Sequence, residues 1–377
     1  MINLKNLEKD IVNIAENLAK RNFILDKEYF LTLQNEIKNF NLEVELLNKE
    51  RNTNRDKNRG VEIKARLEVL KEVIRMKNIE WNNETAKIPN LLHDEVPLGK
   101  GEEHNTVRKI CEPYVENNYW TNIQLERKDI DTEVGTMLAG ARFAVLKGNV
   151  AKTQRKLINA AMDHYEQKGY EEMYVPHIVL PEIMYGTGQY PKFKDDLFTV
   201  DNNYLIPTGE VPLTNIYNDK ILKVEEVNTA IKLMTRTPCF RKEVGAAGRD
   251  TKGIMRQHQF EKVEVVKICH PDIAQNEFYL MLQDIEDFVL TLGIKYRIVE
   301  LCTGDIGFAG HKAFDIELFF KEENRFREIA SITWCGDFQA RRMNTRFKED
   351  GKTKLVHTMN GTGLAVGRIL EALVQNN

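Results

Sequence analysis

The sequence predicts an α+β protein in which an N-terminal antiparallel helical hairpin precedes a domain built on an antiparallel sheet with flanking helices. Residues 1–85 place apolar side chains at helical spacing, and a segment rich in proline, glycine and polar residues follows at 88–105. After that segment, short apolar runs alternate with glycines. These observations place the boundary after residue 105 and give two predicted domains, 1–105 and 106–377.

The predicted hairpin rests on a coiled-coil seam that occurs in two stretches. Intervals of three and four residues separate the apolar side chains of the first stretch, and the same period resumes after a polar segment at 51–60 that ends in a glycine suited to a turn. A shorter amphipathic helix precedes the hairpin. The apolar positions are Phe30, Leu33, Ile37, Phe40, Val44 and Leu47, then Ile63, Leu67, Leu70, Ile74 and Trp81, with Leu4, Leu7, Ile11, Ile14 and Leu18 in the shorter helix.

The predicted turn carries a cluster of positive charge. Its cations are Arg51, Arg55, Lys57 and Arg59, opposed by Asp56 alone. A dimerisation coiled coil is the commoner use of such a seam, but it would place its charges along the helices. A long arm with a basic end suits an acidic and distant partner, such as a nucleic-acid backbone. On the arm alone, both interpretations stay open.

Strand candidates dominate the second predicted domain. A doubly wound fold would alternate strands with helices, whereas here neighbouring strand candidates adjoin each other, which favours an antiparallel sheet with flanking helices. The strand candidates are 173–180, which contains Pro176, then 203–209, 232–244, 258–268, 295–301, 313–320 and 326–334, with helical periods at 151–167, 271–292 and 363–375.

Composition restricts the class of protein. Hydrophobic residues make up 42% of the chain and charged residues 29%, which indicates a soluble protein, and no window approaches the ~20 apolar residues of a membrane span. The net charge of -3 gives no overall attraction to nucleic acid. Five cysteines without C-x-x-C spacing argue against a disulfide framework and a zinc site. We expect a cytoplasmic protein that binds neither membranes nor DNA.

The second predicted domain lacks the common nucleotide-binding loops and carries arginines instead. Neither a P-loop, a G-x-G-x-x-G after a strand nor a G-x-S-x-G occurs. Arginine binds phosphate through two hydrogen bonds and keeps its charge, so it can bind a polyphosphate without a glycine-rich loop. The residues in question are Arg241, Arg256 and Arg368, expected at sheet positions, with Glu210, Glu243, Glu264 and Glu328.

These residues fall in segments that resemble a known family. The segment FRKEVGAAGRDTKGIMRQHQFEKVE at 240–264 resembles motif 2 of class II aminoacyl-tRNA synthetases, in the form found in the bacterial-type seryl-tRNA synthetase family. The segment 357–373 contains the motif 3 pattern G-L-x-x-G-R, and Pro176 stands where motif 1 places its dimer-interface proline. The N-terminal hairpin is similar to the family's tRNA-binding arm. Other segments that resemble the family, in the same order, are 186–198, 207–215, 301–317 and 336–347.

The resemblance implies a two-step ligase reaction. The carboxylate of L-serine attacks the α-phosphate of ATP to give seryl-adenylate and pyrophosphate, and a terminal hydroxyl of tRNA(Ser) then takes the seryl group. Such an in-line displacement needs positioning and charge neutralisation, and no nucleophile from the protein. The implied partners are L-serine, ATP with Mg²⁺, tRNA(Ser) and a second copy of the chain in a homodimer.

The resemblance also assigns roles in ATP binding. Arg241 bridges the α-phosphate and the serine carboxylate, and Glu243, expected on the same strand face, reaches the adenine edge. Phe260 stacks on adenine, with a core phenylalanine as the alternative interpretation. Arg256 and Arg368 match the β/γ-phosphate end, and Arg241 and Arg368 are the implied catalytic residues. The full implied ATP-binding set is Arg241, Glu243, Arg256, Phe260, Glu328, Ser331 and Arg368.

Serine needs a counter-charge for its ammonium and a hydrogen-bond partner for its hydroxyl. Without the resemblance, Thr208 would be interpreted as a strand threonine and Glu210 as a surface acid. Glu328 and Ser331 match the Mg²⁺ positions, and His258 is expected to be structural. The implied serine-binding set is Thr208, Glu210, Arg241, Glu264, Asn360 and Thr362, and the implied tRNA contacts are Arg51, Arg55, Lys57 and Arg59.

Several features depart from the family pattern. Position 209 is glycine where alanine is usual, Trp334 stands where it could crowd the site, and the arm is shorter than the bacterial one. Two rival functions therefore stay open: an amino acid ligase that charges a carrier protein, and a non-catalytic paralogue that binds RNA. Carrier-protein ligases resemble versions without the arm, and a paralogue would be expected to lose the motif arginines that this chain keeps.

Overall fold

The structure is a computed structural model that describes residues 7–113, 118–244 and 253–376. Contacts divide the chain into two units, Met1–Leu91 and Leu92–Asn377. The division falls inside the segment 88–105, which is rich in proline, glycine and polar residues. Within the described residues, no helix combines the length and the apolar composition needed to cross a membrane.

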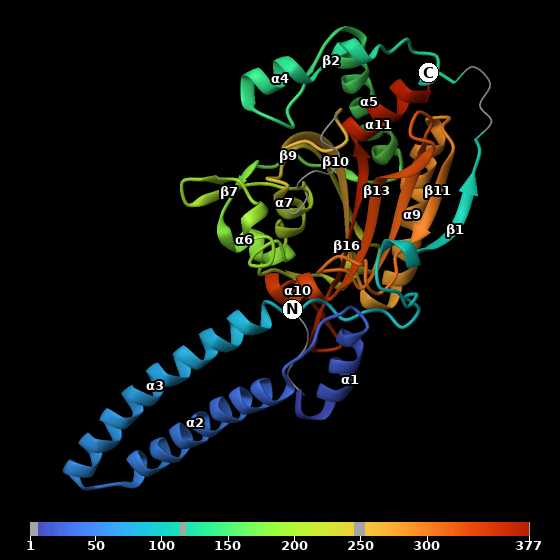
Figure 1. Cartoon of the computed structure of the whole chain (residues 1–377). Helices are drawn as coiled ribbons and strands as arrows, with labels where there is room; N and C mark the ends of the chain where they lie inside the picture. Colours follow the sequence, from blue (N-terminus) through green and yellow to red (C-terminus); the bar gives the residue numbers. More distant parts are fainter. Residues whose placement is uncertain (1–6, 114–117, 245–252, 377) are drawn as a thin grey trace. The chain divides into compact units, whose positions relative to one another are not determined.

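The first unit is a helical hairpin preceded by a shorter helix, as predicted (Figure 1). Its seam buries Phe30 and Leu33 of one helix and Ile63 and Leu70 of the other. Ion pairs also connect the two helices of the hairpin; one joins Arg66 Nε to Glu43 Oε1 at 2.7 Å. The helices are α1 (Leu7–Ala19), α2 (Lys27–Thr53) and α3 (Lys57–Thr85). Leu4, one of the apolar positions predicted for the shorter helix, lies outside the described residues.

The turn of the hairpin is shorter than predicted. The polar segment 51–60 was expected to form the turn, but only 54–56 leave the helices, and Gly60 lies inside α3. Asp56 explains the early start of α3, because its side chain accepts a hydrogen bond from Asn58 N at 2.9 Å and so caps the helix. Asn54 Oδ1 in turn accepts from Asp56 N at 3.0 Å, which closes the turn.

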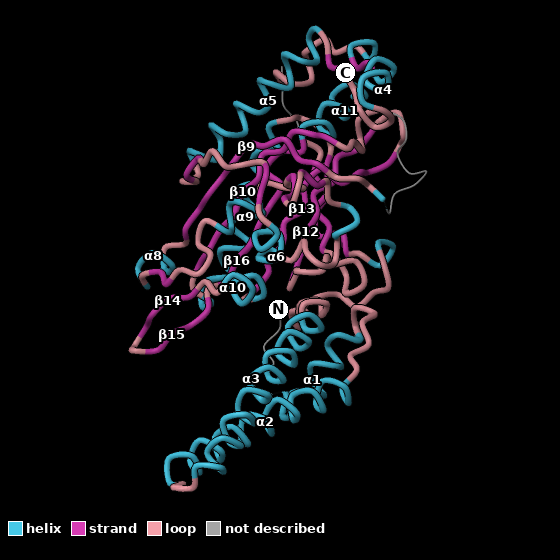
Figure 2. Tube along the Cα trace, turned by 90° about the vertical axis from the view of Figure 1, so that its left-hand side faces the viewer, coloured by secondary structure: helices cyan, strands magenta, loops and turns pink. Residues whose placement is uncertain are grey.

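The second unit is built on an eight-stranded sheet in the order β1-β11-β12-β13-β16-β10-β9-β4. Its pairs are antiparallel except that β4 runs parallel to β9, which confirms the predicted α+β class. Figure 2 shows the central strands side by side. The strands are β1 (Thr106–Cys111), β4 (Glu171–Glu172), β9 (Ile231–Phe240), β10 (Gln259–Cys269), β11 (Tyr296–Glu300), β12 (Lys312–Phe320), β13 (Arg325–Gly336) and β16 (His357–Ala365).

Three helices pack on one face of this sheet, and the opposite face carries polar side chains beside a smaller apolar cluster that includes Val266 and Ile268. The helices α5 (Gly148–Gln167), α9 (Ala274–Thr291) and α11 (Val366–Asn376) bury the main core with that face. On β10, Val263 and Val265 join the core, whereas Lys262 and Glu264 alternate with them and point to the opposite face. That face carries the candidate site.

Smaller elements surround the sheet. Two short sheets, β5-β7-β6 and β15-β14-β8, and the pair β2-β3 complete the strands. Their bounds are β2 (Ile130–Asp131), β3 (Val145–Leu146), β5 (Ile178–Val179), β6 (Thr199–Val200), β7 (Asn203–Leu205), β8 (Ile221–Leu222), β14 (Arg346–Glu349) and β15 (Lys352–Leu355); the short helices are α4 (Thr132–Ala139), α6 (Pro181–Thr187), α7 (Glu210–Asn215), α8 (Val224–Asn228) and α10 (Phe338–Met343).

Several predicted elements differ from the structure, and the strand expected at 232–244 already ends at Phe240. The strand expected at 173–180 is interrupted, and Pro176 lies between β4 and β5, where its missing N–H breaks no ladder. The helix predicted at 363–375 starts later than expected, at Val366, because the strand β16 continues to Ala365. Short apolar runs beside glycines fit a strand or a helix equally well, and pairing with β10 and β13 decides for the strand.

Candidate active site

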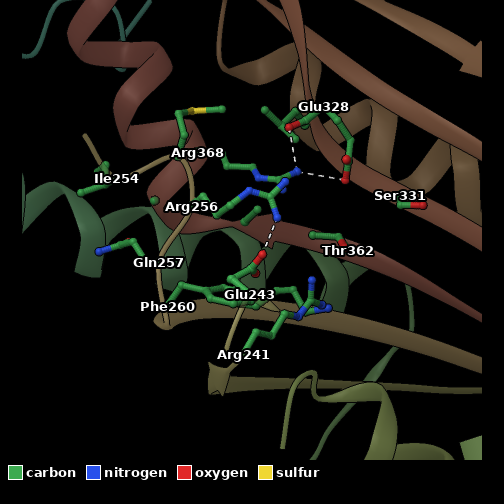
Figure 3. Close-up of a pocket in the computed structure, with 15 residues that line it drawn as sticks. Arg241, Glu243, Ile254, Arg256, Gln257, Phe260, Glu328, Ser331, Thr362 and Arg368 are labelled. Carbon is green, nitrogen blue, oxygen red and sulfur yellow. Dashed lines mark hydrogen bonds and ion pairs between the residues drawn. The ribbon is translucent and has the colours of Figure 1, made fainter. Parts of the chain in front are cut away.

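One pocket on the polar face of the sheet gathers the predicted ATP-binding residues (Figure 3). It collects side chains from both ends of the motif 2 hairpin, from β13 and from the start of α11. Their role in ATP binding stays a prediction. The predicted residues that line it are Arg241, Glu243, Arg256, Phe260, Glu328, Ser331 and Arg368, with Thr362 of the predicted serine set.

The pocket arginines lie outside the strands, contrary to the expectation. Arg241 follows the end of β9, Arg256 precedes β10, and Arg368 belongs to α11. From the end of a strand or the start of a helix, a long side chain can extend sideways over the sheet. An arginine in the middle of a strand would instead project straight out from the sheet. The sheet therefore forms the floor of the pocket, and the arginines reach over it from the rim.

Glu243 also departs from the predicted geometry. Because β9 ends at Phe240, Glu243 does not share a strand face with Arg241, and its backbone adopts a φ of 53°. A non-glycine residue in this region is uncommon and costs free energy, so surrounding contacts must hold it there. Glu243 forms an ion pair with Arg256 inside the pocket. The turn thus brings Glu243 into the pocket by a route that strand alternation does not predict.

Arginine–carboxylate pairs hold the pocket's charges facing one another. Besides the pair of Glu243 and Arg256, Arg368 Nη1 lies 2.9 Å from Glu328 Oε1 and donates to the Glu328 carbonyl oxygen at 3.0 Å (Figure 3). Arg368 is the main cause of a lowered pKa at Glu328, which therefore stays ionised. Such pairs orient the guanidinium groups before any anion enters.

Arg241 is positioned by backbone and ring contacts. Its Nε donates to the Pro207 carbonyl oxygen at 3.1 Å, and its guanidinium lies 5.3 Å from the centre of the Phe260 ring. The Arg241 backbone is tied to His258, whose Nδ1 lies 3.0 Å from the Arg241 carbonyl oxygen. His258 thus supports the hairpin, in the structural role expected from the sequence.

A second polar cluster adjoins the pocket and contains the rest of the predicted serine set. Thr208 Oγ1 donates to Glu264 Oε2 at 3.2 Å, and Asn360 Nδ2 donates to Glu210 Oε1 at 2.5 Å. Glu264 of β10 also lies opposite Thr362 of β16 in the ladder. These residues come from a loop, a short helix and two strands, and all except Asn360 and Thr362 are buried.

Burial raises the pKa of both carboxyl groups in this cluster. The pKa of Glu210 rises to about 7, first because the group is buried and second because the Glu264 carboxylate is near. Burial likewise raises the pKa of Glu264, although Lys262 acts in the opposite direction. A buried pair of acidic groups with one lysine suits a cationic ligand, which would supply the missing positive charge.

Comparison with known proteins decides the family. A family model described as the class II tRNA synthetase core domain (G, H, P, S and T) matches residues 192–377. The serine–tRNA ligase of Sulfurovum sp. (strain NBC37-1) is 41% identical over 401 residues, covering 100% of this chain and 96% of that protein. The chain belongs to the serine–tRNA ligase family.

Further relatives and solved structures agree with this assignment. The serine–tRNA ligase of Mycoplasma capricolum subsp. capricolum is 39% identical and covers 96% of this chain and 86% of that protein. The crystal structure of seryl-tRNA synthetase from Pyrococcus horikoshii complexed with ATP matches with a TM-score of 0.91 at 27% identity, covering 100% of this chain and 94% of that one. The cytoplasmic serine-tRNA ligase from Naegleria fowleri in complex with AMP matches with a TM-score of 0.85 at 28% identity, covering 96% and 89%.

Two departures from the serine–tRNA ligase pattern are accommodated by the structure. A Cβ at Gly209 would lie 2.7 Å from Thr235 Cγ2, so glycine leaves room for Thr235 beside Glu264. The sequence suggests that Trp334 could crowd the site, but the structure shows that it does not. It belongs to the core on the opposite face of the sheet, where its ring packs 4.9 Å from His311 and 6.0 Å from Phe278.

Sequence reasoning missed two residues of this site. Lys262 lines the pocket and donates to Thr208 Oγ1 at 2.8 Å. Gln339 donates to Glu210 Oε1 at 2.6 Å and accepts from Thr358 Oγ1 at 2.7 Å. The signal for Lys262 was its place between Phe260 and Glu264 at the period of two on one strand. The resemblance quoted the segment that contains Gln339 but assigned it no role.

The predicted tRNA contacts gather at the tip of the hairpin in the first unit. Arg51 lies in the last turn of α2, Arg55 lies in the turn between the helices, and Lys57 and Arg59 lie in the first turn of α3; all are exposed. Arg59 is held within the hairpin, because its guanidinium pairs with Glu50 at 2.7 Å and with Glu62 at 3.1 Å. Their contact with tRNA stays a prediction.

Proposed function

We propose that this chain activates L-serine with ATP to form seryl-adenylate and pyrophosphate, and then transfers the seryl group to tRNA(Ser). The proposal rests on two neighbouring sites on one face of the sheet. One is the arginine-lined pocket, and the other is the buried acidic cluster, which adjoins the pocket through Lys262 and Thr362. A polyphosphate suits the first and an amino acid ammonium the second. Membership of the serine–tRNA ligase family supports both assignments.

In the first step, a serine carboxylate oxygen forms a bond to the α-phosphorus as the bond to the pyrophosphate oxygen breaks. Arg241 lies where it can contact both the carboxylate and the α-phosphate. Arg256 and Arg368 can turn from their carboxylate partners to stabilise the charge that develops on the departing pyrophosphate. In the second step, a ribose hydroxyl of the tRNA attacks the seryl carbonyl carbon and AMP departs.

Mg²⁺ fits the residues at one edge of the pocket. Glu328 and Ser331 offer a carboxylate and a hydroxyl, the hard oxygen ligands that Mg²⁺ prefers. Both lie on β13, and Ser331 stands opposite Asp315 of the neighbouring strand β12 in the ladder. When bound there, the cation would neutralise charge on the ATP phosphates.

Serine recognition follows from the buried acidic cluster. Thr208 and Glu264 would take the ammonium, and the Glu210 carboxyl, which accepts hydrogen bonds from Gln339 and Asn360, would bind the hydroxyl. Rejection of alanine would result because these polar groups would lack a partner when the hydroxyl is absent. Thr362 would close the pocket.

The raised pKa of Glu210 predicts a pH-dependent serine affinity. Below about pH 7 the Glu210 carboxyl is neutral and attracts the ammonium less, so the KM for serine should rise as pH falls from 8 to 6 while the KM for ATP changes little. Glu210→Gln should weaken serine binding mainly above about pH 7, where the wild-type carboxylate is ionised, and so remove this part of the slope. Steady-state exchange rates across that range provide the measurement. A serine KM that falls with decreasing pH would contradict the assignment.

We also infer a homodimer formed through the catalytic unit. Around Pro176, Tyr174 is 94% exposed, and Ile178 and Leu180 are exposed as well. Apolar side chains gathered in this way are typical of a surface that a partner covers. Sedimentation should show a dimer at micromolar concentration, and Tyr174→Asp should shift it toward monomer. A wild-type chain that sediments as a monomer would contradict the inference.

The division of labour that we propose assigns tRNA binding to residues 1–105 and the chemistry to 106–377. A tRNA charging assay with labelled serine tests the complete function against the rival functions. Transfer of serine to a carrier protein and not to tRNA would support the carrier ligase. RNA binding without any adenylate formation would support the paralogue.

A further inference from the structure

Lys262 occupies the place that the proposed function assigns to the substrate's ammonium. Its Nζ donates to Thr208 Oγ1 at 2.8 Å and forms an ion pair with Glu264 Oε2. Thr208 and Glu264 are the two groups predicted to hold the serine ammonium, and they also bond to each other. The lysine side chain is 8% exposed, so its charge is compensated mainly by these contacts. A protein ammonium thus already fills the subsite.

Two ammonium groups cannot share this subsite. Glu264 has one carboxylate, its Oε2 already accepts from both Thr208 and Lys262, and an ammonium has no acceptor with which to receive a hydrogen bond from another. Two cations a few ångströms apart in a buried site repel strongly. Serine's ammonium and the Lys262 ammonium therefore compete for the same oxygen atoms.

A second place for the Lys262 ammonium lies nearby. Lys262 lines the arginine-lined pocket together with Arg241, Ser331 and Thr362. Its four-carbon stem is flexible, so the ammonium can move while β10 stays paired on both sides. With ATP and serine bound, that pocket would contain phosphate and carboxylate oxygens, which compensate a lysine charge as well as Glu264 does.

We propose that Lys262 is an ion-pair switch that couples the two substrate subsites: in the empty site its ammonium holds the place of the serine ammonium between Thr208 and Glu264, and serine displaces it toward the phosphates of ATP. This inference rests on the proposed function. It makes Lys262 a positioning residue, which keeps the buried carboxylate neutralised before binding and adds positive charge at the α-phosphate afterwards.

The switch requires serine and ATP to bind with positive coupling. Without ATP, serine must expel the lysine into a pocket with little compensating negative charge. With ATP present, the expelled ammonium finds new partners, so each substrate should strengthen the binding of the other by the same factor. Couplings of this kind typically amount to about 5-fold to 150-fold in affinity.

The experiment measures serine binding by calorimetry with and without a non-hydrolysable ATP analogue. In the wild-type protein the analogue should tighten serine binding by about tenfold or more. In Lys262→Met, serine alone should bind tighter than to the wild type because its competitor is gone, and the tightening by the analogue should fall below about threefold. The rate of pyrophosphate exchange should nevertheless fall, because the positive charge at the α-phosphate is removed.

Lys267→Met is the matched control. Lys267 is also a buried, ion-paired lysine of β10, but it points to the opposite face and pairs with Glu277 of α9 at 2.9 Å. Its removal should lower the melting temperature and leave the coupling between serine and ATP unchanged. A loss of coupling in this control would assign the effect to general loosening of β10 and overturn the switch.

Two further results would overturn the switch while leaving the proposed function intact. One is a wild-type protein that exchanges pyrophosphate with serine but shows no coupling, a measurement that does not depend on any variant folding. The other is a Lys262→Met variant that binds serine more weakly with the coupling preserved, which would make Lys262 a fixed part of the site. Absence of serine-dependent exchange in the wild type would instead contradict the proposed function itself.

Discussion

Arg241→Ala should abolish serine-dependent pyrophosphate exchange and leave the fold intact. Arg241 lies in the pocket beside the acidic cluster, and in the proposed reaction its guanidinium would contact the reacting carboxylate and the α-phosphate together. Removal of one such charge-stabilising group costs about 10²–10³ in rate, and the proposed role has this arginine contact both reactants. Arg241→Lys should restore little, since an ammonium cannot reproduce the planar two-bond contact.

Arg236→Ala is the control for this prediction. Arg236 lies on the same strand, β9, and is also ion-paired, to Glu261 at 2.9 Å, but its side chain is 48% exposed and lies outside the pocket. Its removal should change exchange by less than about twofold, as expected for an exposed ion pair. If Arg241→Ala retains exchange within about tenfold, a loss of only ~1.4 kcal/mol of transition-state stabilisation, the role assigned to Arg241 is wrong.

Deletion of residues 27–85 with a short linker should leave pyrophosphate exchange nearly unchanged and collapse tRNA charging. The predicted adenylate-forming residues all lie in the second unit, whereas α2 and α3 form the hairpin of the first. An arm that serves tRNA acts in the second step alone. Equal loss of exchange and charging would show that the hairpin supports the fold, and the tRNA interpretation of its charge would fail.

The tip of the hairpin allows a finer test of the same prediction. Replacing Arg51, Arg55 and Lys57 with alanine should raise the KM for tRNA and flatten its salt dependence by about 0.7 to 0.9 in log-log slope for each tRNA phosphate that the tip no longer neutralises. Arg59→Ala should do less, because that guanidinium is already paired with Glu50 and Glu62. Arg66→Ala, which breaks an ion pair on the shaft, is the control and should leave the slope unchanged.

Periodicity in the sequence predicted the elements but not how the site is assembled. The three- and four-residue intervals indicated the hairpin because a helical seam is a local pattern. The turn was misjudged because Gly60 suggested a break, whereas the Asp56 cap outweighs one glycine in a first helical turn. Capping is a single hydrogen bond, and it leaves little trace in a hydrophobic pattern.

The pocket residues show the same limit more sharply. The resemblance found Arg241, Glu243 and Arg256, but strand alternation misplaced them, because the turn after β9 and the positive φ of Glu243 depend on tertiary contacts. Lys262 carried the right period but looked like any strand lysine. Only its contacts with Thr208 and Glu264 distinguish it from other strand lysines. Thr208 lies 54 residues earlier in the chain, so the sequence around Lys262 does not reveal that contact.

Amino-acid-dependent pyrophosphate exchange is the sharpest test of the proposed function, because it needs only the chain, ATP, Mg²⁺ and a panel of amino acids. We expect exchange with L-serine, much weaker exchange with alanine and threonine, and almost complete loss in Arg241→Ala. Exchange that is absent with serine, or equally fast with alanine, would contradict the proposed serine-activating site.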